Sequence, residues 1–260
     1  MTSGGVGRGQ SFAAASGVTS LMIEILIHKM ERRDHLSEAE KHVMRQLPVT
    51  RRRVPAGQII VQEGDRQEVS LLLASGFAGR FGILKEGERQ FTQLGVPGDF
   101  LDLHSLLLKR MDHSVATLSA CELGAIPHRN LRDLTESDPH LARLLWLETV
   151  VDAAIHRTWL VGLGRRDALA RTAHLLCETS VRLEAVGLSD GSRFDLPLSQ
   201  REMADMVGIS TVHMNRTVQA LRARGLIDWE GGCVSILDWD RLSTLAEFDP
   251  RYLRLWHEPV

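Results

Sequence analysis

Residues 199–225 carry a pattern that few folds can accommodate. Ser199 with Glu202 three residues later is a capping box, which begins a helix. Gly208 permits a tight turn after that helix, and Ser210 can cap a second one. Two short helices joined around a glycine form a helix-turn-helix unit, whose second helix fits the major groove of DNA. The alternative, a helical pair in an unrelated domain, requires all these signals to coincide.

The second helix of this unit should present a polar face to DNA. Val218 and Leu221 form its predicted buried side, and Met214 could join them. The opposite side carries the residues that could contact bases or phosphates, namely Thr211, Val212, His213, Asn215, Arg216 and Gln219. Ser199, Arg201 and Ser210 stand at helix starts, where phosphate contacts fix register without reading sequence.

A hairpin is predicted directly after the second helix. Gly231 and Gly232 separate two strand-like runs, Leu226–Trp229 and Cys233–Leu237. A hairpin in this place would form a wing that reaches the DNA backbone.

Residues 54–128 have a different sequence pattern, in which short strand-like runs are separated by turns. The turns are marked by Gly57, Gly64, Gly76, Gly87, Gly95 and Gly98. Short strands with regularly placed glycines predict a small all-β roll. An insert at Phe100–Lys109 could be a short helix lying on this roll.

Helical spacing returns at Asp138 and continues to about Leu163. One stripe alternates steps of three and four residues: Leu144, Leu147, Val151, Ala154, Thr158 and Val161. This spacing predicts a coiled-coil-like seam between two copies of the chain, although a helix packed on its own domain is the alternative. Gly162 and Gly164 then predict a hinge, followed by a helix from Arg165 to about Val186.

Composition excludes several classes of protein. The 260 residues carry 31 basic and 33 acidic side chains, so any contact with DNA must come from a local patch. No apolar run is long enough to span a bilayer, which excludes a membrane protein. Cys121, Cys177 and Cys233 are isolated and odd in number, which argues against a disulfide framework. The Gly- and Ser-rich first twenty residues predict a flexible tail of a cytoplasmic protein.

The predicted fold class is therefore α+β, with an N-terminal β-roll, a long helix and a C-terminal winged helix-turn-helix. We expect a flexible tail at 1–20, a sensor roll at 21–137, a dimerisation helix at 138–163, a DNA-binding domain at 164–245 and a C-terminal tail at 246–260.

This order of parts resembles the Crp–Fnr family of bacterial transcription regulators, over about Leu36 to Leu245. The resemblance is strongest at SQREMADMVGISTVHMNRTVQALRARGLI, residues 199–227, and is supported by Gln62-Glu63-Gly64 and Pro97-Gly98-Asp99-Phe100. It implies a homodimer that binds an inverted repeat in double-stranded DNA, with RNA polymerase as a partner and a small-molecule effector in the roll.

The resemblance also assigns roles on the second helix. The family's second base-reading arginine falls on Arg216, whereas its first arginine and its glutamate are replaced by Thr211 and Val212. The family's usual half-site is therefore not expected. Val212 could contact a thymine methyl, and His213 and Asn215 could contact a base or a phosphate.

The effector pocket implied by the resemblance differs from that of the cyclic-AMP-binding members. Their glutamate falls on Leu103, beside Asp102, and their Arg-Ser pair becomes His113-Ser114. Because a neutral histidine cannot replace the charged fork of arginine against a phosphate, cyclic AMP is not expected. The candidate pocket residues are Asp102, Leu103, His104, His113 and Ser114. The first twenty residues contain no cysteine, so an iron–sulfur cluster is not expected either, and the effector is unknown.

A metal site in the roll is a weaker hypothesis. Asp102, His104, Asp112 and His113 are of types that bind transition metals, but nothing in the sequence fixes their distances. Polar pocket residues are the stronger interpretation, and no metal ligand is assigned.

The sequence also bears on two other functions. No nucleophile elbow, phosphate loop, paired carboxylates or zinc-hydrolase spacing is present, so no enzyme is predicted. Thr211 and Val212 stand where the family has two base-reading residues. This leaves open the alternative of a ligand-binding sensor module that has lost specific DNA binding.

Overall fold

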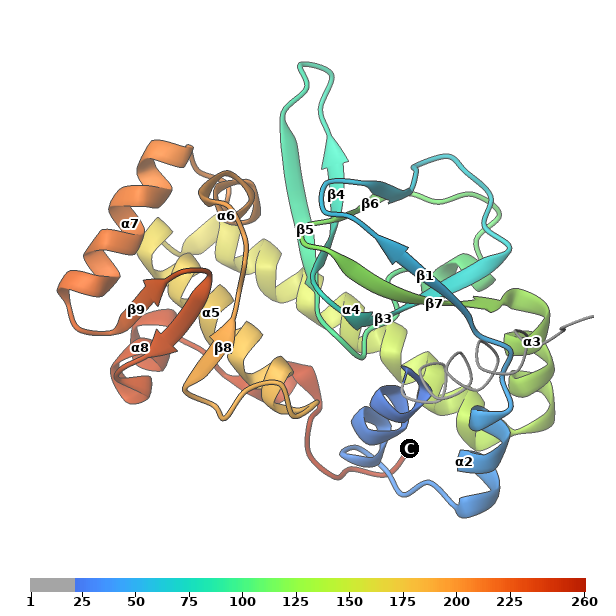
Figure 1. The fold of residues 1–260 in the computed structure, drawn as a ribbon. Helices are drawn as coiled ribbons and strands as arrows, with labels where there is room; N and C mark the ends of the chain where they lie inside the picture. The colour runs from blue at the N-terminus through green and yellow to red at the C-terminus, as the bar shows by residue number, and fades with distance from the viewer. Residues whose placement is uncertain (1–21) are drawn as a thin grey trace, which may run out of the picture.

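The computed structural model describes residues 22–260 and shows a β-roll, a long helix and a C-terminal unit (Figure 1). The predicted tail at 1–20 lies outside these residues. Within them, no helix is both long enough and apolar enough to span a membrane. Before the roll stand a helix at 22–31 and α2 (Glu38–Arg45), which begins with a complete capping box of Ser37 and Glu40.

The roll consists of two antiparallel sheets. Its strands are β1 (Thr50–Val54), β2 (Ile59–Val61), β3 (Val69–Ser75), β4 (Ala78–Ile83), β5 (Arg89–Gly95), β6 (Ser114–Thr117) and β7 (Cys121–Pro127). The sheet orders are β1-β7-β3 and β2-β6-β4-β5. Leu71, Leu73, Val115 and Leu123 belong to the core between them. The predicted roll is therefore confirmed.

Strand β1 was not predicted. Its sequence, Thr-Arg-Arg-Arg-Val, has no apolar alternation, and it lies at a sheet edge, paired only with β7 from Thr50↔Ala125 to Val54↔Cys121. The pairing between backbones, rather than burial of side chains, makes this segment a strand. The predicted helix at 100–109 is also shorter than expected, because only η1 (Leu103–Leu106) is helical there.

Two helices follow the roll. α3 (His128–Ser137) was missed, and it buries Leu131 and Leu134. α4 (Pro139–Arg165) begins where predicted, because the Asp138 carboxylate accepts hydrogen bonds from the backbone N–H groups of His140 and Leu141 (3.0 Å each). In Figure 1 α4 runs along the molecule, from the side of the roll to the C-terminal unit.

The predicted hinge at Gly162 and Gly164 is wrong in position. α4 continues through both glycines, and the backbone N–H of Arg166 donates to the carbonyl oxygen of Gly162 (2.9 Å). Glycine inside a helix costs only about 1 kcal/mol, so neighbouring contacts can hold it helical. The chain turns instead at Arg166, whose ψ is 146°.

The predicted seam is also wrong in part. Leu144 packs into the core beneath the N-terminal helices, and Val151 packs against Ile155 and Leu253 of the same chain. The apolar side chains of α4 that remain exposed are Trp146, Val150, Leu160 and Val161. Periodicity identified the helix but could not tell which apolar row the chain itself covers.

The C-terminal unit contains the predicted winged helix-turn-helix. Its elements are α5 (Ala168–Glu184), β8 (Arg193–Asp195), α6 (Gln200–Val207), α7 (Thr211–Ala223), β9 (Ile227–Glu230), β10 (Cys233–Ile236) and α8 (Trp239–Ala246). Strand β8 was not predicted, and it pairs with β10 to complete a sheet of order β8-β10-β9.

Residues 246–260 do not behave as the predicted free tail. They contain η2 (Pro250–Leu253), and Leu253 is buried against α4. The backbone N–H of Glu258 donates to the carbonyl oxygen of Arg33 (2.8 Å), and that of Val260 donates to Asp34 Oδ2 (2.7 Å). The C-terminus therefore lies beside the N-terminal helices (Figure 1).

A buried ion network joins these units. Lys29 Nζ donates to Asp99 Oδ1 (2.9 Å) in the roll and to Glu148 Oε2 (2.6 Å) on α4. Glu148 also pairs with Arg33, and Asp99 with Arg182 of α5. Burial opposes ionisation of Asp99, but Lys29 and Arg182 outweigh it and hold the pKa of this carboxyl well below its usual range.

Replacing Glu148 tests this network. Glu148→Ala should lower the free energy of unfolding by about 3–5 kcal/mol, because Arg33 and Lys29 lose a buried counter-ion. Glu24→Ala removes the same charge from a half-exposed pair with Arg45 and should cost less than about 1 kcal/mol. Urea unfolding followed by circular dichroism measures both, and equal losses would contradict the assigned role.

His140 provides a pH-dependent contact at the start of α4. Burial opposes its protonation, but hydrogen bonds to Glu40 and to Asp34 (Nε2–Oδ2, 3.2 Å) outweigh it and raise the pKa of His140. A raised pKa adds stability below the unfolded pKa of about 6.5, and this stability is lost as pH rises through the folded pKa. His140→Gln should therefore destabilise the protein more at pH 6 than at pH 9 in thermal melts; a pH-independent loss would refute this.

Candidate nucleic-acid interface and sensor pocket

The helix-turn-helix is built from local capping interactions. In α6, Ser199 Oγ accepts a hydrogen bond from the N–H of Glu202 (3.2 Å), and Glu202 Oε2 accepts one from the N–H of Ser199 (2.7 Å). Gly208 ends α6 at φ 67° and ψ 50°, and a Cβ there would lie 3.0 Å from Leu163. Ser210 Oγ then accepts from the N–H of His213 (3.2 Å) and starts α7. The predicted unit is confirmed.

Burial separates the two faces of α7 as the sequence predicts. Met214, Val218 and Leu221 are buried, together with Thr217. The nine residues predicted to contact DNA are all exposed: Ser199, Arg201, Ser210, Thr211, Val212, His213, Asn215, Arg216 and Gln219. In Figure 1 α7 lies at the outer edge of the C-terminal unit, on the side away from the roll. The geometry leaves this face open to a large partner, and DNA contact by each residue stays a prediction.

The arginines of this face differ in their electrostatic surroundings. Arg222 Nη2 pairs with Asp228 (3.0 Å) and Glu230 (3.4 Å). Across residues 22–260, no carboxylate lies within ion-pair distance of Arg201 or Arg216. These two guanidinium groups are therefore available to phosphates or bases without breaking an internal pair.

The wing has an unusual charge. β9 carries Asp228 and Glu230, and neither β9 nor β10 contains a basic residue. Gly231 and Gly232 form the turn with positive φ values of 57° and 81°. A contact between this wing and the DNA backbone would depend on backbone N–H groups, since its side chains would repel phosphates.

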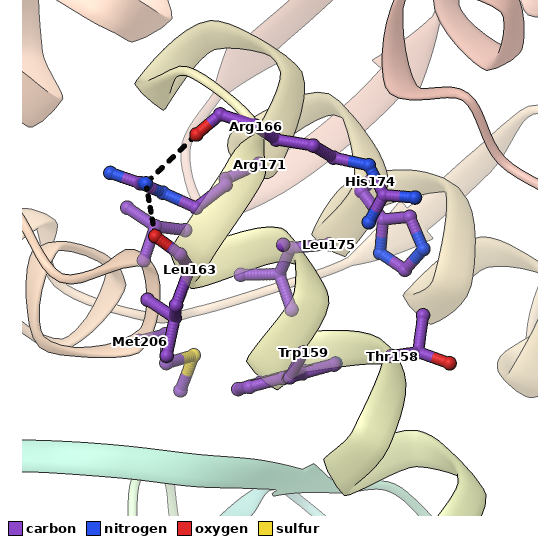
Figure 2. Close-up of a pocket in the computed structure, with 10 residues that line it drawn as sticks. Thr158, Trp159, Leu163, Arg166, Arg171, His174, Leu175 and Met206 are labelled. Carbon is purple, nitrogen blue, oxygen red and sulfur yellow. Dashed lines mark hydrogen bonds between the residues drawn. The ribbon is translucent and has the colours of Figure 1, made fainter.

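The joint between α4 and α5 is held from within by Arg171 (Figure 2). Arg171 Nη1 donates to the carbonyl oxygens of Leu163 (3.3 Å) and Arg166 (2.9 Å), where α4 ends. The adjoining cavity, beside Trp159 and His174, has a volume of about 30 Å³. This volume suits a water molecule rather than an organic effector.

The roll also touches the helix-turn-helix directly, which the sequence did not reveal. On β5, Arg89 Nη2 donates to Asp205 Oδ2 (2.8 Å), and Gln90 Nε2 donates to the carbonyl oxygen of Met206 (3.1 Å). Both acceptors lie on α6. The β4–β5 hairpin therefore contacts the DNA-binding unit directly, through hydrogen bonds that do not involve α4.

A pocket of about 560 Å³ lies between the 103–113 segment and α4. Of the predicted effector residues, Leu103, His104 and His113 line it. Asp102 and Ser114 do not. Asp102 is fully buried, where its Oδ1 accepts from the N–H of Leu71 (2.6 Å) and burial raises its pKa to about 6.

Ser114 serves the roll instead of the pocket. Its Oγ accepts hydrogen bonds from Gln62 Nε2 (3.3 Å) and from the backbone N–H of Glu63 (3.0 Å). The sequence missed three ionisable residues that line the pocket, Arg80, Asp152 and His156. They come from β4 and α4, so only the folded chain brings them to the 103–113 segment.

The pocket does not suit a cyclic phosphate. Its one arginine, Arg80, is already committed, because Nη2 pairs with Asp152 Oδ2 (2.7 Å) and Nε donates to the carbonyl oxygen of Leu101 (2.8 Å). The position expected for a ribose-binding glutamate is occupied by Leu103, which is buried.

The cysteines do not suit an iron–sulfur cluster. Cys121, Cys177 and Cys233 lie on β7, α5 and β10, and within residues 22–260 they form no group with one another or with other ligand side chains. A cluster needs several cysteine thiolates at one place.

Comparisons with known proteins agree with this architecture. Residues 51–138 match the model of the cyclic nucleotide-binding domain, and residues 170–245 match that of the Crp-like helix-turn-helix domain. The first match covers the roll and the second covers α5 to α8.

Relatives are found along most of the chain. It is 30% identical to the transcriptional activator protein FnrL of Cereibacter sphaeroides, over 72% of this chain and 76% of that protein. It is 28% identical to the nitrogen fixation regulation protein FixK of Bradyrhizobium diazoefficiens, over 74% and 79% respectively.

The fold is also that of a solved structure. FixK2 from Bradyrhizobium japonicum superposes with a TM-score of 0.70 at 22% identity, covering 76% of this chain and 98% of that one. The 30% identity to FnrL, the match to the Crp-like helix-turn-helix model and the exposed recognition helix together show the family. The chain belongs to the Crp–Fnr family and is a DNA-binding transcription regulator.

Proposed function

We propose that the protein works as a homodimer that binds an inverted repeat in DNA and regulates transcription there. The observation that carries this proposal is the open face of α7, where Arg216 is exposed and has no counter-ion among residues 22–260. Two such helices in a dimer would lie about one DNA turn apart, roughly 34 Å. We assign sensing to residues 21–137, pairing to 138–163 and DNA binding to 164–245.

Arg216 is the proposed base-reading residue. Its guanidinium can donate two parallel hydrogen bonds to O6 and N7 of guanine. Val212, which is 65% exposed, offers a methyl-sized apolar contact to thymine. Thr211, His213 and Asn215 complete a face whose half-site differs from one read by two arginines and a glutamate.

Register on the duplex would come from the starts of the two helices. Ser199 and Arg201 stand at the start of α6, and Ser210 caps α7. Helix N-termini carry partial positive charge and free N–H groups, which favour phosphates. These contacts would add affinity at any sequence.

Pairing would use the exposed row of α4. Trp146, Val150 and Val161 are separated by four and eleven residues, about one and three helical turns, so they lie on one side of the helix. They are 70%, 45% and 57% exposed. A groove of about 750 Å³ beside this row, between α4 and the C-terminal segment, provides room for a second helix.

An effector in the pocket between the 103–113 segment and α4 would act by favouring one arrangement of α4 over another. Because that helix carries both the pairing row and the joint to α5, a shift there changes the spacing of the recognition helices. RNA polymerase is the expected partner at the promoter, and the likeness to FnrL, a transcriptional activator protein, supports positive control. This function needs no catalysis, and DNA as its target supports a cytoplasmic location.

Arg216→Ala and Arg201→Ala separate base reading from phosphate contact. Arg216→Ala should cost about 1–3 kcal/mol and relax preference at one base pair per half-site. Arg201→Ala should weaken all sequences alike and lower the salt slope by about one. Selection of bound DNA, followed by anisotropy at several salt concentrations, measures both.

Unchanged base preference in Arg216→Ala would remove that residue from the reading face. No affinity of the unsubstituted protein at low salt, with or without candidate effectors, would favour a sensor that has lost DNA binding.

The pairing row is tested by introducing charge. Val161→Glu should raise the dimer dissociation constant at least tenfold, about 1.4 kcal/mol, because two carboxylates would meet across the symmetric contact. Leu237→Glu is the control, since Leu237 is 59% exposed but lies outside α4. Sedimentation velocity reports the mass of each variant. A Val161→Glu protein that stays dimeric would place the interface elsewhere.

A further inference from the structure

We propose that His104, Asp112 and His113 bind a divalent transition-metal ion in the pocket between the 103–113 segment and α4. Their ligand atoms all lie within 4.8 Å of one another, and within residues 22–260 this is the one such group of histidine, cysteine and carboxylate side chains. The rings of the two histidines lie with centroids 5.0 Å apart. The fold brings these residues together from η1 and from the segment just before β6.

One ring nitrogen of each histidine in this cluster has no hydrogen-bond partner among the described residues. Nε2 of His104 and Nε2 of His113 are both buried and make no hydrogen bond among the described residues. A buried polar atom without a partner is rare and calls for a missing water or ion. Two of them, side by side, indicate a shared ligand.

The tautomer of His113 favours a cation as that ligand. A carboxylate only accepts hydrogen bonds, so His113 Nδ1 donates to Asp112 Oδ1 (2.8 Å) and Nε2 keeps its lone pair. In the ion-free protein this hydrogen bond therefore keeps the Nε2 lone pair available. The site therefore offers electron pairs to a positive charge.

Burial supports the same chemistry. Desolvation, aided by the charge of Arg80, lowers the pKa of His104 to about 4 and also lowers that of His113. Both rings are then neutral near pH 7, which is the form that binds metals. The Arg80 charge does not exclude a cation, because Arg80 pairs with Asp152 (2.7 Å).

The donor set selects the class of ion. Two imidazoles and one carboxylate suit Zn²⁺, Fe²⁺ or Ni²⁺, whereas Mg²⁺ and Ca²⁺ prefer oxygen ligands only. His104 Nε2 lies 4.0 Å from Asp112 Oδ1, so the ligands must close slightly around an ion with bonds of about 2.0–2.2 Å. The Asp112 side chain is 71% exposed and can turn toward the ion, exchanging its hydrogen bond with His113 Nδ1 for a bond to the metal.

Such an ion would face the helix that we propose pairs the two subunits. Trp146, Asp152 and His156 of α4 line the same pocket. Binding there would bias the position of α4, and this regulatory role rests on the proposed function, whereas the metal site itself does not.

Binding of Zn²⁺ and Co²⁺ to the untagged full chain tests the site. Calorimetry should show one Zn²⁺ per chain, and Co²⁺ should give visible absorption bands. His113→Gln and Asp112→Asn should each weaken binding at least about tenfold. His35→Gln, an exposed histidine outside the cluster, should leave it unchanged, and Ca²⁺ should not compete. Asp112→Asn keeps the test valid if the buried substitution unfolds the chain.

Two results would overturn the site. One is the absence of Zn²⁺ binding, and the other is binding that survives both substitutions. Measurements of DNA affinity with and without Zn²⁺ separate the claims. A protein that binds DNA normally but takes up no Zn²⁺ contradicts the metal site alone. An ion bound at these residues by a protein without DNA affinity contradicts the proposed function alone, and equal effects of Zn²⁺ on the DNA affinity of wild type and His113→Gln remove the regulatory role.

Discussion

Three cations (Lys29, Arg33 and Arg182) and three carboxylates (Asp99, Glu148 and Glu178) are buried where the N-terminal helices, the roll, α4 and α5 meet, and they fix how the units of this protein are arranged. Lys29 and Arg33 share Glu148, while Lys29 and Arg182 share Asp99. A charge buried without its partner is expensive, so each unit must keep its place for the set to remain satisfied. Buried ion pairs, and not apolar packing alone, therefore hold the roll and the DNA-binding unit together.

Two other connections lie between sensing and recognition. α4 passes beside the pocket that contains His104, Asp112 and His113, and it continues to the joint with α5 that Arg171 holds. The β4–β5 hairpin contacts α6 through Arg89 and Gln90. A change at the pocket thus has two routes to the recognition helix, and each consists of hydrogen bonds that must either hold or break. Such all-or-none contacts suit a switch between two arrangements better than a gradual deformation.

The family likeness is strong in architecture and weak in chemistry. The pocket presents imidazoles where cyclic-AMP-binding members present an arginine, and its own Arg80 is neutralised by Asp152. The recognition helix presents Thr211 and Val212 beside Arg216, and the wing is acidic. The scaffold is conserved in shape while the ligand and the half-site are set by a few side chains, which is the usual relation between fold and function.

The sequence by itself determined the local features of this protein. The capping box at Ser199, the turn at Gly208 and the polar face around Arg216 depend on residues close in the chain, and the glycine-punctuated strands of the roll do as well. Tertiary structure decided what depends on distant partners. β1 is a strand because β7 offers its edge, and Val151 is unavailable for pairing because Leu253 covers it. Asp102 lies outside the pocket, because its carboxylate accepts a hydrogen bond from the N–H of Leu71, whereas the rings of His104 and His113 lie next to each other. Periodicity reports which side chains are apolar or polar, but only the packed chain shows which neighbour each one meets.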